Sequence, residues 1–194
     1  MMSDPKPLKR RPLIAELNRR RGNAAIVAGL GSPTYDCAAA ADRPLNFYLW
    51  GGMGGASMVG LGVALAQPDR RVIVVTGDGE MLMGVGSFAA IAVQSPQNLA
   101  VLILDNEAFS ETGQQPGLTR VGVDLSAMAK GAGIRHTMTA CRHSQRDALL
   151  CALLEEEGPV VAVAKVPLDI DPVALPSTDG LFLSHRFREA MLRP

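Results

Sequence analysis

The pattern of apolar and polar positions predicts strands that alternate with helices along most of the chain. Arg71 to Thr76 is a β-branched run bounded by charge and glycine, as expected of a strand buried on both faces. The expected strands are 25–28, 47–50, 71–76, 100–104, 135–139 and 159–166. The expected helices are 13–20, 54–67, 80–94, 124–130 and 144–157, the last opened by a capping box from Ser144 to Asp147.

This alternation predicts an α/β fold with three layers, in which a mostly parallel sheet carries helices on both faces. Residues 1–194 are expected to form a single domain with extended tails at 1–12 and 172–194, and 107–121 is expected to be a loop. Ligands of such sheets bind at the carboxyl ends of the strands. Candidate functional residues are therefore expected there.

Composition narrows the class of ligand. Lys plus Arg and Asp plus Glu are balanced at 19 each, so no overall field favours nucleic acid or an anionic membrane. No apolar run approaches the roughly 18 residues of a membrane span, and a cytoplasmic protein with a small-molecule ligand is expected. A basic cluster near the start lacks interleaved aromatic residues and is interpreted as a solvated helix face. It comprises Lys9, Arg10, Arg11, Arg19, Arg20 and Arg21.

The cysteines carry no recognisable site. Cys37, Cys141 and Cys151 include no C-x-x-C pair, which argues against a disulfide framework and against a zinc or iron–sulfur site. Reduced thiols are expected. The role of Cys37, which lies near the first glycine turn, stays open.

Two expected strand ends each deliver an oxygen-bearing side chain directly after an apolar run. Asp78 follows one strand, between Gly77 and Gly79, and Asn106 follows the next. Mg²⁺ prefers oxygen ligands and is commonly held by one or two carboxylates together with phosphates. The glycines would let the backbone turn and present N–H groups to a diphosphate. Taken alone, the Gly-Asp-Gly tripeptide fits an ordinary turn in which Asp78 caps the next helix, and only the second strand end favours a metal site.

The spacing of these motifs resembles the signature of thiamine diphosphate enzymes. The Gly-Asp-Gly motif around Asp78 is separated by 25 residues from the pair Asp105-Asn106, and that family places a Gly-Asp-Gly motif and an Asn at a similar separation. The resemblance implies that Asp78, Asn106 and the main-chain carbonyl of Ala108 bind Mg²⁺. The family's closing pair is usually Asn-Asn. Asp105 departs from it at the position that is not the direct ligand.

The stretch from Trp50 to Gly54 resembles the family segment that forces the two rings of the cofactor into a V. Met53 would be the apolar residue beneath the cofactor, although its type alone fits ordinary helix packing. The carbonyl of Gly51 would accept a hydrogen bond from the cofactor's 4′-amino group. The resemblance thus gives catalytic positions to Met53 and Gly51. It gives cofactor-binding positions to Gly52, Gly77, Asp78, Gly79, Glu80, Asn106, Ala108, Phe109 and Thr112.

From about Arg43 to Thr119 the chain looks like the C-terminal domain of phosphonopyruvate decarboxylase and the beta subunit of sulfopyruvate decarboxylase. Those enzymes remove CO₂ from a 2-oxo acid that bears an anionic group at C3. The resemblance implies a subunit of a thiamine diphosphate-dependent C–C lyase. The loop from Thr112 to Gln115 is either a flexible turn or a loop of the active site, and the roles of Glu111 and Gln114 stay open.

The family also implies a partner. Its glutamate that protonates the cofactor at N1′ belongs to a second domain, the pyrimidine domain, for which 194 residues leave no room. Glu16, Glu80 and Glu111 do not lie in the sequence context expected of that glutamate. A separate alpha subunit carrying it is therefore expected, in a hetero-oligomer with two-fold symmetry.

Three alternatives stay open. One is the beta subunit of another thiamine diphosphate enzyme, either a carboligase or a 2-oxo acid oxidoreductase, although the latter usually carries cysteines with iron–sulfur spacing. Another is a non-catalytic cofactor-binding module. The last is a Rossmann dinucleotide fold, because Gly29 and Gly31 follow a strand, but its third glycine and its helix are not expected where Ser32-Pro33 follows.

Overall fold

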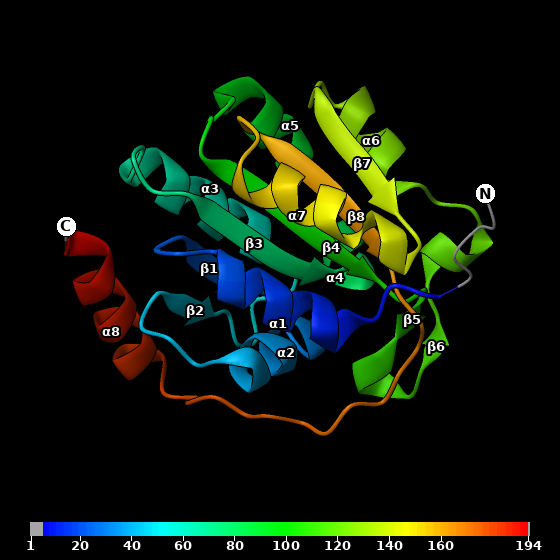
Figure 1. Cartoon of the computed structure of the whole chain (residues 1–194), viewed down its shortest axis with the longest axis horizontal. Helices are drawn as coiled ribbons and strands as arrows, with labels where there is room; N and C mark the ends of the chain where they lie inside the picture. The colour runs from blue at the N-terminus through cyan, green and yellow to red at the C-terminus, as the bar shows by residue number, and fades with distance from the viewer. Residues whose placement is uncertain (1–5, 194) are drawn as a thin grey trace.

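The computed structural model describes residues 6–193. Its centre is a six-stranded sheet with the order β2-β1-β3-β4-β8-β7, in which every neighbouring pair is parallel (Figure 1). All the expected strands are present, with bounds that shift by one to a few residues. They are β1 (Ala25–Ala28), β2 (Asn46–Tyr48), β3 (Val72–Gly77), β4 (Leu99–Asp105), β7 (His136–Ala140) and β8 (Val160–Lys165).

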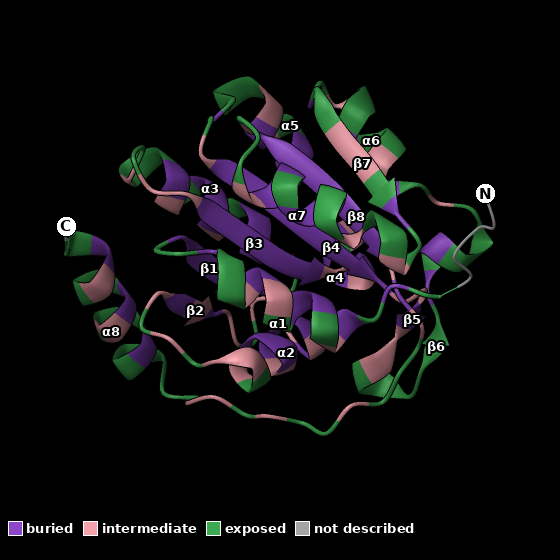
Figure 2. Cartoon of the chain, viewed as in Figure 1, coloured by how far each residue is buried: buried purple, intermediate pink, exposed green. Residues whose placement is uncertain are grey.

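Helices cover both faces of this sheet (Figure 1). One face carries α1 (Arg10–Arg20), α2 (Ser32–Ala40) and α7 (Arg146–Leu154). The other carries α3 (Ala56–Ala66), α4 (Asp78–Met83), α5 (Ser87–Gln94) and α6 (Leu125–Gly131). Successive strand residues point to opposite faces, so that Val74 and Val75 belong to different apolar clusters. Figure 2 shows the central strands buried between the layers. The three-layer α/β fold expected from the sequence is confirmed.

Two helical segments differ from the sequence prediction. α2 begins at Ser32, where no helix is expected, and Pro33 fits its first turn because an N–H group there would have no intrahelical partner. The helix expected over 80–94 is divided into α4 and α5. A Cβ on Gly84 would overlap the carbonyl oxygen of Gly54. The chain therefore turns at Gly84, where the segment between α4 and α5 contacts the loop that contains Gly54.

The capping box predicted at Ser144 is wrong. α7 begins two residues later, after a single 3₁₀ turn, and Gln145 accepts the N–H group of Cys141. Asp147 instead pairs with Arg20 of α1 at 2.8 Å. Spacing along the chain cannot reveal this ion pair, because its partner lies on another helix.

The segment after β4, expected as a loop, contains four short elements. They are β5 (Ala108–Phe109), the 3₁₀ turn η1 (Ser110–Thr112), β6 (Gln115–Pro116) and the 3₁₀ turn η2 (Leu118–Val121), and β5 pairs with β6 in antiparallel orientation. After this small hairpin the chain returns to the carboxyl end of β3, where Thr119 of η2 contacts Asp78.

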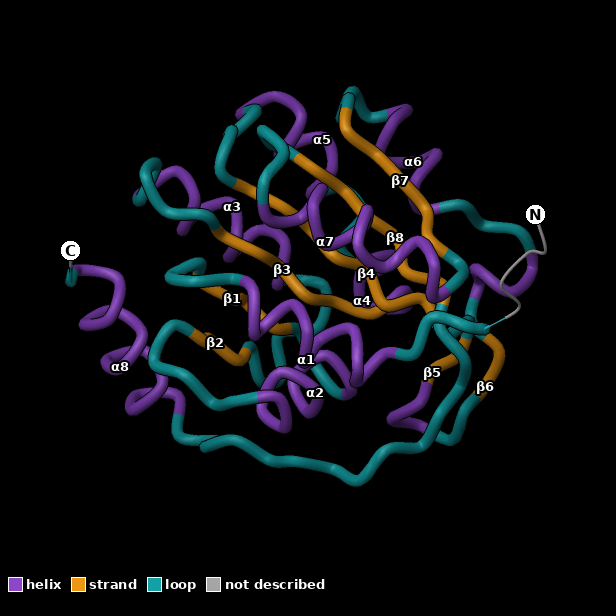
Figure 3. The backbone as a smooth tube through the Cα atoms, viewed as in Figure 1, coloured by secondary structure: helices purple, strands orange, loops and turns teal. Residues whose placement is uncertain are grey.

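The predicted extended tails are also corrected. Residues 166–179 cross the molecule without helix or strand, and α8 (Gly180–Leu192) follows (Figure 3). Asp179 caps α8, and Leu183, Phe187 and Met191 bury a helical stripe that the prediction overlooked. At the other end, α1 already begins at Arg10, and residues 1–5 of the predicted tail lie outside the described range. None of the helices described in residues 6–193 is long and apolar enough to cross a membrane.

Candidate active site

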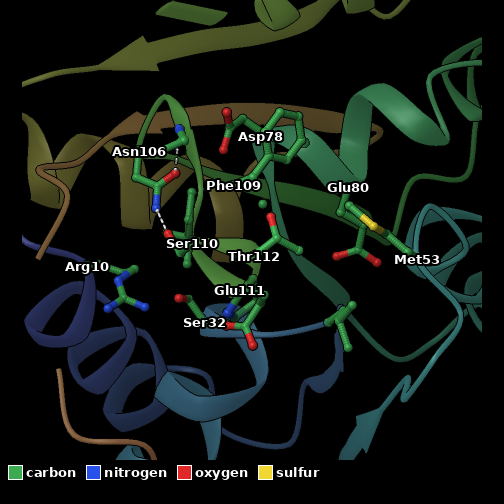
Figure 4. A pocket seen from close by; sticks show the side chains of 16 residues that line it. Arg10, Ser32, Met53, Asp78, Glu80, Asn106, Phe109, Ser110, Glu111 and Thr112 are labelled. Carbon is green, nitrogen blue, oxygen red and sulfur yellow. Dashed lines mark hydrogen bonds between the residues drawn. The ribbon is translucent and has the colours of Figure 1, made fainter. Parts of the chain in front are cut away.

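A cavity of about 140 Å³ lies at the carboxyl ends of the central strands (Figure 4). We call residues 77–80 and 104–112, which begin at the last residues of β3 and β4, the strand-end wall. Arg10 of α1, residues 30–33 around the start of α2, and Met53 form the assembled wall. The predicted site residues that line the cavity are Met53, Gly77, Asp78, Gly79, Glu80, Asn106, Ala108, Phe109 and Thr112. Gly51 and Gly52 belong to the loop of Met53 but do not line the cavity.

The two candidate metal ligands follow neighbouring strands, as the sequence predicts. Gly77 of β3 lies in register with Leu104 of β4, so the side chains after both strands emerge at the same edge of the sheet. Asp78 is 2% exposed. None of the ion pairs among residues 7–193 involves Asp78. Within that range, no Lys, Arg or His nitrogen lies within ion-pair distance of this buried carboxylate.

A single hydroxyl connects the two buried aspartates of this wall. Thr119 Oγ1 lies 3.0 Å from Asp78 Oδ2 and 2.8 Å from Asp105 Oδ1, and its one proton serves one carboxylate at a time. Burial, followed by the charge of Asp105, raises the pKa of Asp78 to about 6. A divalent cation would relieve this crowding of negative charge.

Asp105, the departure from the usual Asn, has a cation of its own. Lys165 stands opposite it in register on β8, and Lys165 Nζ lies 2.8 Å from Asp105 Oδ2 and 2.8 Å from Glu107 Oε1. The ammonium group thus neutralises a carboxylate where the family usually has an amide. Sequence reasoning missed Lys165 and Thr119, because both lie outside the matched motifs.

Asn106 is held by its own loop. Its Nδ2 donates to Ser110 Oγ at 2.7 Å, and its Oδ1 accepts the N–H group of Ala108 at 3.1 Å (Figure 4). These bonds determine which end of the amide faces which neighbour. Oδ1 keeps a second lone pair for a further partner.

Glu80 is a buried carboxylate that lines the same cavity as Met53 (Figure 4). Thr76 donates a hydrogen bond of 2.8 Å to its Oε2, and burial raises the pKa of this glutamate. The same carboxylate lies against the Cα of Gly29, where a Cβ would overlap it. Glu80 therefore ties the end of β1 to the end of β3.

The loop of Met53 depends on glycine. Gly51 and Gly54 have φ values of 71° and 85°, in the left-handed region that other residues rarely adopt. A Cβ on Gly54 would lie 3.1 Å from the main-chain nitrogen of Gly84, so the loop packs directly on the turn after α4. Met53 itself is 38% exposed, which leaves its side chain accessible from the cavity.

The assembled wall contains residues that the sequence did not mark. Arg10 is 6% exposed and pairs with Asp36 and Asp171 at 3.0 Å each. The interpretation of the basic cluster as a solvated face is wrong for Arg10, and also for Arg21, which is buried and donates to Asn46. Distant partners cause this burial, so no local pattern shows it.

Ser32 is the other unmarked residue of this wall. It opens the nine-residue helix α2 directly after Gly31, whose φ is 75°. The N–H groups at a helix N-terminus attract anions. The glycines at Gly29 and Gly31 signal this turn in the sequence, but no helix is expected after them because Ser32-Pro33 follows.

Comparison with known proteins agrees with this geometry. Residues 30–164 match the family described as thiamine pyrophosphate enzyme, C-terminal TPP binding domain. The chain belongs to this family. An X-ray structure of a Mycobacterium smegmatis protein proposed to be a thiamin diphosphate-dependent enzyme has a TM-score of 0.72, with 24% identity over 84% of this chain and 32% of that one. At that identity the likeness concerns the fold alone.

Two relatives carry more specific names. Phosphonopyruvate decarboxylase of Streptomyces viridochromogenes is 39% identical over 184 residues, which cover 94% of this chain and 45% of that protein. Sulfopyruvate decarboxylase subunit beta of Methanocaldococcus jannaschii is 35% identical over 175 residues, which cover 87% of this chain and 88% of that subunit. The chain therefore spans less than half of the first relative and most of the second.

Proposed function

We propose that this chain is one subunit of a thiamine diphosphate-dependent lyase that decarboxylates a 2-oxo acid similar to sulfopyruvate or phosphonopyruvate. The names of the two relatives support the substrate class. One observation carries the assignment of the site: Asp78 and Asn106 follow adjacent strands on one wall of the cavity, and Met53 lines the same cavity from another segment.

The strand-end wall suits a diphosphate bound through Mg²⁺. In this proposal Asp78, Asn106 Oδ1 and the carbonyl of Ala108 bind the cation, and phosphate oxygens supply further ligands. Among residues 6–193 no group of three His, Cys, Asp or Glu side chains is arranged to hold a metal. Besides the Asp78 carboxylate, a cation here would accordingly depend on amide, carbonyl and phosphate oxygens.

Other residues of the cavity would hold the rest of the diphosphate and its surroundings. Gly77 and Gly79 would offer N–H groups, and Ser32 would donate to a phosphate oxygen at the start of α2. A Cβ on Gly79 would lie only 2.6 Å from the ring of Phe109, so glycine alone fits beneath this ring. Glu80, Thr112 and the loop glycine Gly52 complete the predicted cofactor contacts.

When bound, the thiazolium ring supplies an electron sink for the loss of CO₂. The contribution of this chain is to position the cofactor. Met53 would support its two rings, and the carbonyl of Gly51 would accept a hydrogen bond from the 4′-amino group. The left-handed Gly51 gives the loop the turn that this role requires.

A separate subunit would supply the glutamate for N1′ and close the open side of the cavity. Support comes from the Methanocaldococcus relative, which is named as a beta subunit. Two glutamates of this chain do line the cavity, but both are engaged: Glu80 accepts from Thr76, and Glu111 accepts from Tyr35 at 3.0 Å. We expect two-fold symmetry in the assembly.

The test is to purify the chain alone and together with its candidate partner, and to measure CO₂ release from a panel of 2-oxo acids with thiamine diphosphate and Mg²⁺. Activity should require both polypeptides and should be lost in Asp78→Ala but not in the remote control Asp124→Asn. Full turnover by the chain alone would contradict the division of the active site, and Glu80→Gln and Glu111→Gln would then identify the internal glutamate.

Two outcomes would select the alternatives. Formation of a C–C bond without net release of the decarboxylated product would indicate a carboligase, and cofactor binding without turnover in any complex would indicate a non-catalytic module. A ferredoxin-linked oxidoreductase is disfavoured for this chain because Cys37 is buried, whereas Cys141 and Cys151 are exposed, the first directly after β7 and the second in α7.

A further inference from the structure

The C-terminal arm, residues 166–192, contacts a residue of the candidate site, Arg10, and also Trp50, which precedes the loop of Met53. Near its start, Arg10 Nη2 pairs with Asp171 Oδ2 at 3.0 Å, and Arg11 Nη2 donates to the carbonyl of Pro172 at 2.8 Å. Further along, the carbonyl of Ser177 accepts a hydrogen bond of 3.1 Å from Trp50 Nε1. Between these points the arm has neither helix nor strand, and it runs past α1 and α2 (Figures 1 and 3).

The end of the arm is firmly anchored. Arg186 of α8 forms a two-pronged ion pair with Asp42 at 2.8 and 2.9 Å, and the rings of Phe187 and Phe47 lie 5.5 Å apart. Planar, bidentate pairs of this kind are among the stronger surface contacts. α8 therefore holds the segment that bears Ser177 in place.

Trp50 lies between this arm and the cofactor loop. It directly precedes Gly51, and its ring lies 6.4 Å from that of Tyr35, whose hydroxyl donates to Glu111 on the cavity rim. The loop that follows is rich in glycine and has few side chains of its own to hold it. A half-buried indole fixed by the arm is thus well placed to restrain the loop.

We infer that Trp50 is a positioning residue: through its hydrogen bond to Ser177, docking of the C-terminal arm sets the conformation of loop 49–55 and thereby the seat of the cofactor's aminopyrimidine half. The part that concerns the cofactor rests on the proposed function. The contact between arm and loop does not.

The first test needs no cofactor, because Trp50 is the only tryptophan of the chain. Arg186→Ala should shift its fluorescence emission to the red and increase quenching by acrylamide, while the matched control Arg188→Ala on the same helix should do neither. An unchanged emission in Arg186→Ala, together with faster amide exchange in α8, would overturn the inference, because the arm would then have left without disturbing Trp50.

A second variant isolates the hydrogen bond. Trp50→Phe keeps an aromatic ring and removes the donor, and amide hydrogen exchange of residues 49–55 and 174–179 should accelerate about three- to ten-fold, the factor that one neutral hydrogen bond represents. Residues 77–80 and 104–108 should exchange as in the wild type, and circular dichroism should report an intact fold. Unchanged exchange in residues 49–55 would refute the positioning role.

The last test uses the assembled enzyme and compares two probes by calorimetry in the presence of Mg²⁺. Trp50→Phe and Arg186→Ala should weaken binding of thiamine diphosphate about three- to ten-fold but leave binding of inorganic pyrophosphate unchanged. Equal thiamine diphosphate affinity in Trp50→Phe and wild type would overturn the coupling to the cofactor. If the wild-type enzyme binds neither probe, the proposed function fails, and the fluorescence and exchange results still decide the contact between arm and loop.

Discussion

The two walls of the cavity are built in different ways. The strand-end wall comes from two stretches that follow directly on β3 and β4, and the hydrogen bonds between these central strands hold both in register. The assembled wall combines α1, the start of α2 and the loop before α3. Its Arg10 is held by Asp36 and Asp171, which are far apart in the sequence.

This difference suggests a division of labour. The rigid strand-end wall concentrates buried carboxylates, which suits the holding of a cation and a diphosphate. In the assembled wall the charge of Arg10 is already paired with two aspartates, and the apolar side chain of Met53 on its glycine-rich loop suits the orientation of the cofactor rings. Substitutions in the first wall should mainly reduce affinity, and those in the second should mainly reduce turnover or have small effects.

The largest effect is expected at Asp78. Asp78→Asn should weaken Mg²⁺-dependent binding of thiamine diphosphate by at least about 100-fold, since even indirect contacts of a metal site contribute 10- to 100-fold. The metal-free chain should be no less stable, because burial and Asp105 already disfavour the ionised carboxylate. Calorimetry and thermal melting would measure both. Asp124→Asn, which preserves a helix cap, is the control, and equal affinity in the Asp78 variant would remove the metal assignment.

Met53 tests the orienting role of the assembled wall. Met53→Ala should lower kcat of the assembled enzyme on the order of 10- to 100-fold through misplacement of the rings, with little change in melting temperature. Met128→Ala is a matched control, because both side chains are 38% exposed. A loss of about 2–5 kcal/mol in stability with normal turnover would show that Met53 is only part of the core.

Thr119 sharpens the account of the strand-end wall. Thr119→Val removes the hydroxyl that contacts both Asp78 and Asp105, and should weaken Mg²⁺-dependent cofactor binding about ten-fold. Thr119→Ser should retain most of the affinity, because it keeps the hydroxyl. If both variants bind equally well in titrations, the link between the two carboxylates has no part in holding the metal.

The smallest effect is expected at Ser32. Ser32→Ala should raise the KM for thiamine diphosphate about five-fold, the value of one hydrogen bond, because the N–H groups of α2 remain. Ser144→Ala, in the turn before α7, should leave KM unchanged. If Ser32→Ala weakened cofactor binding as much as Asp78→Asn, the two walls would not differ as proposed. The start of α2 would then be a principal phosphate contact.

The strand-end wall could be located from the sequence because its residues lie at the ends of two strands, β3 and β4, that the sequence pattern predicts. A β-branched or apolar run predicts each strand, and the next residue then lies at the carboxyl edge by construction of a parallel sheet. The adjacency of Asp78 and Asn106 followed from that reasoning. Their service as ligands remains a prediction.

The assembled wall could not be located in the same way. Arg10 is buried by two acidic partners that no spacing rule connects to it, and the start of α2 was obscured by Pro33. The sequence predicts an extended tail in place of the arm because the helical stripe of α8 is short and follows a segment that contains several prolines. Each error concerns contacts between remote segments, which periodicity does not encode.

One consequence of α8 concerns the rim of the sheet. β2 is the terminal strand on its side, and an open strand edge is a template for pairing with other chains. α8 packs beside it, and Arg186 also donates to the main-chain carbonyl of Asn46 at 3.2 Å. A chain cleaved before Gly180 would uncover Phe47 and this carbonyl together. We expect such a chain to self-associate in concentrated solution, as light scattering would detect, because the edge of β2 would then be open to pairing.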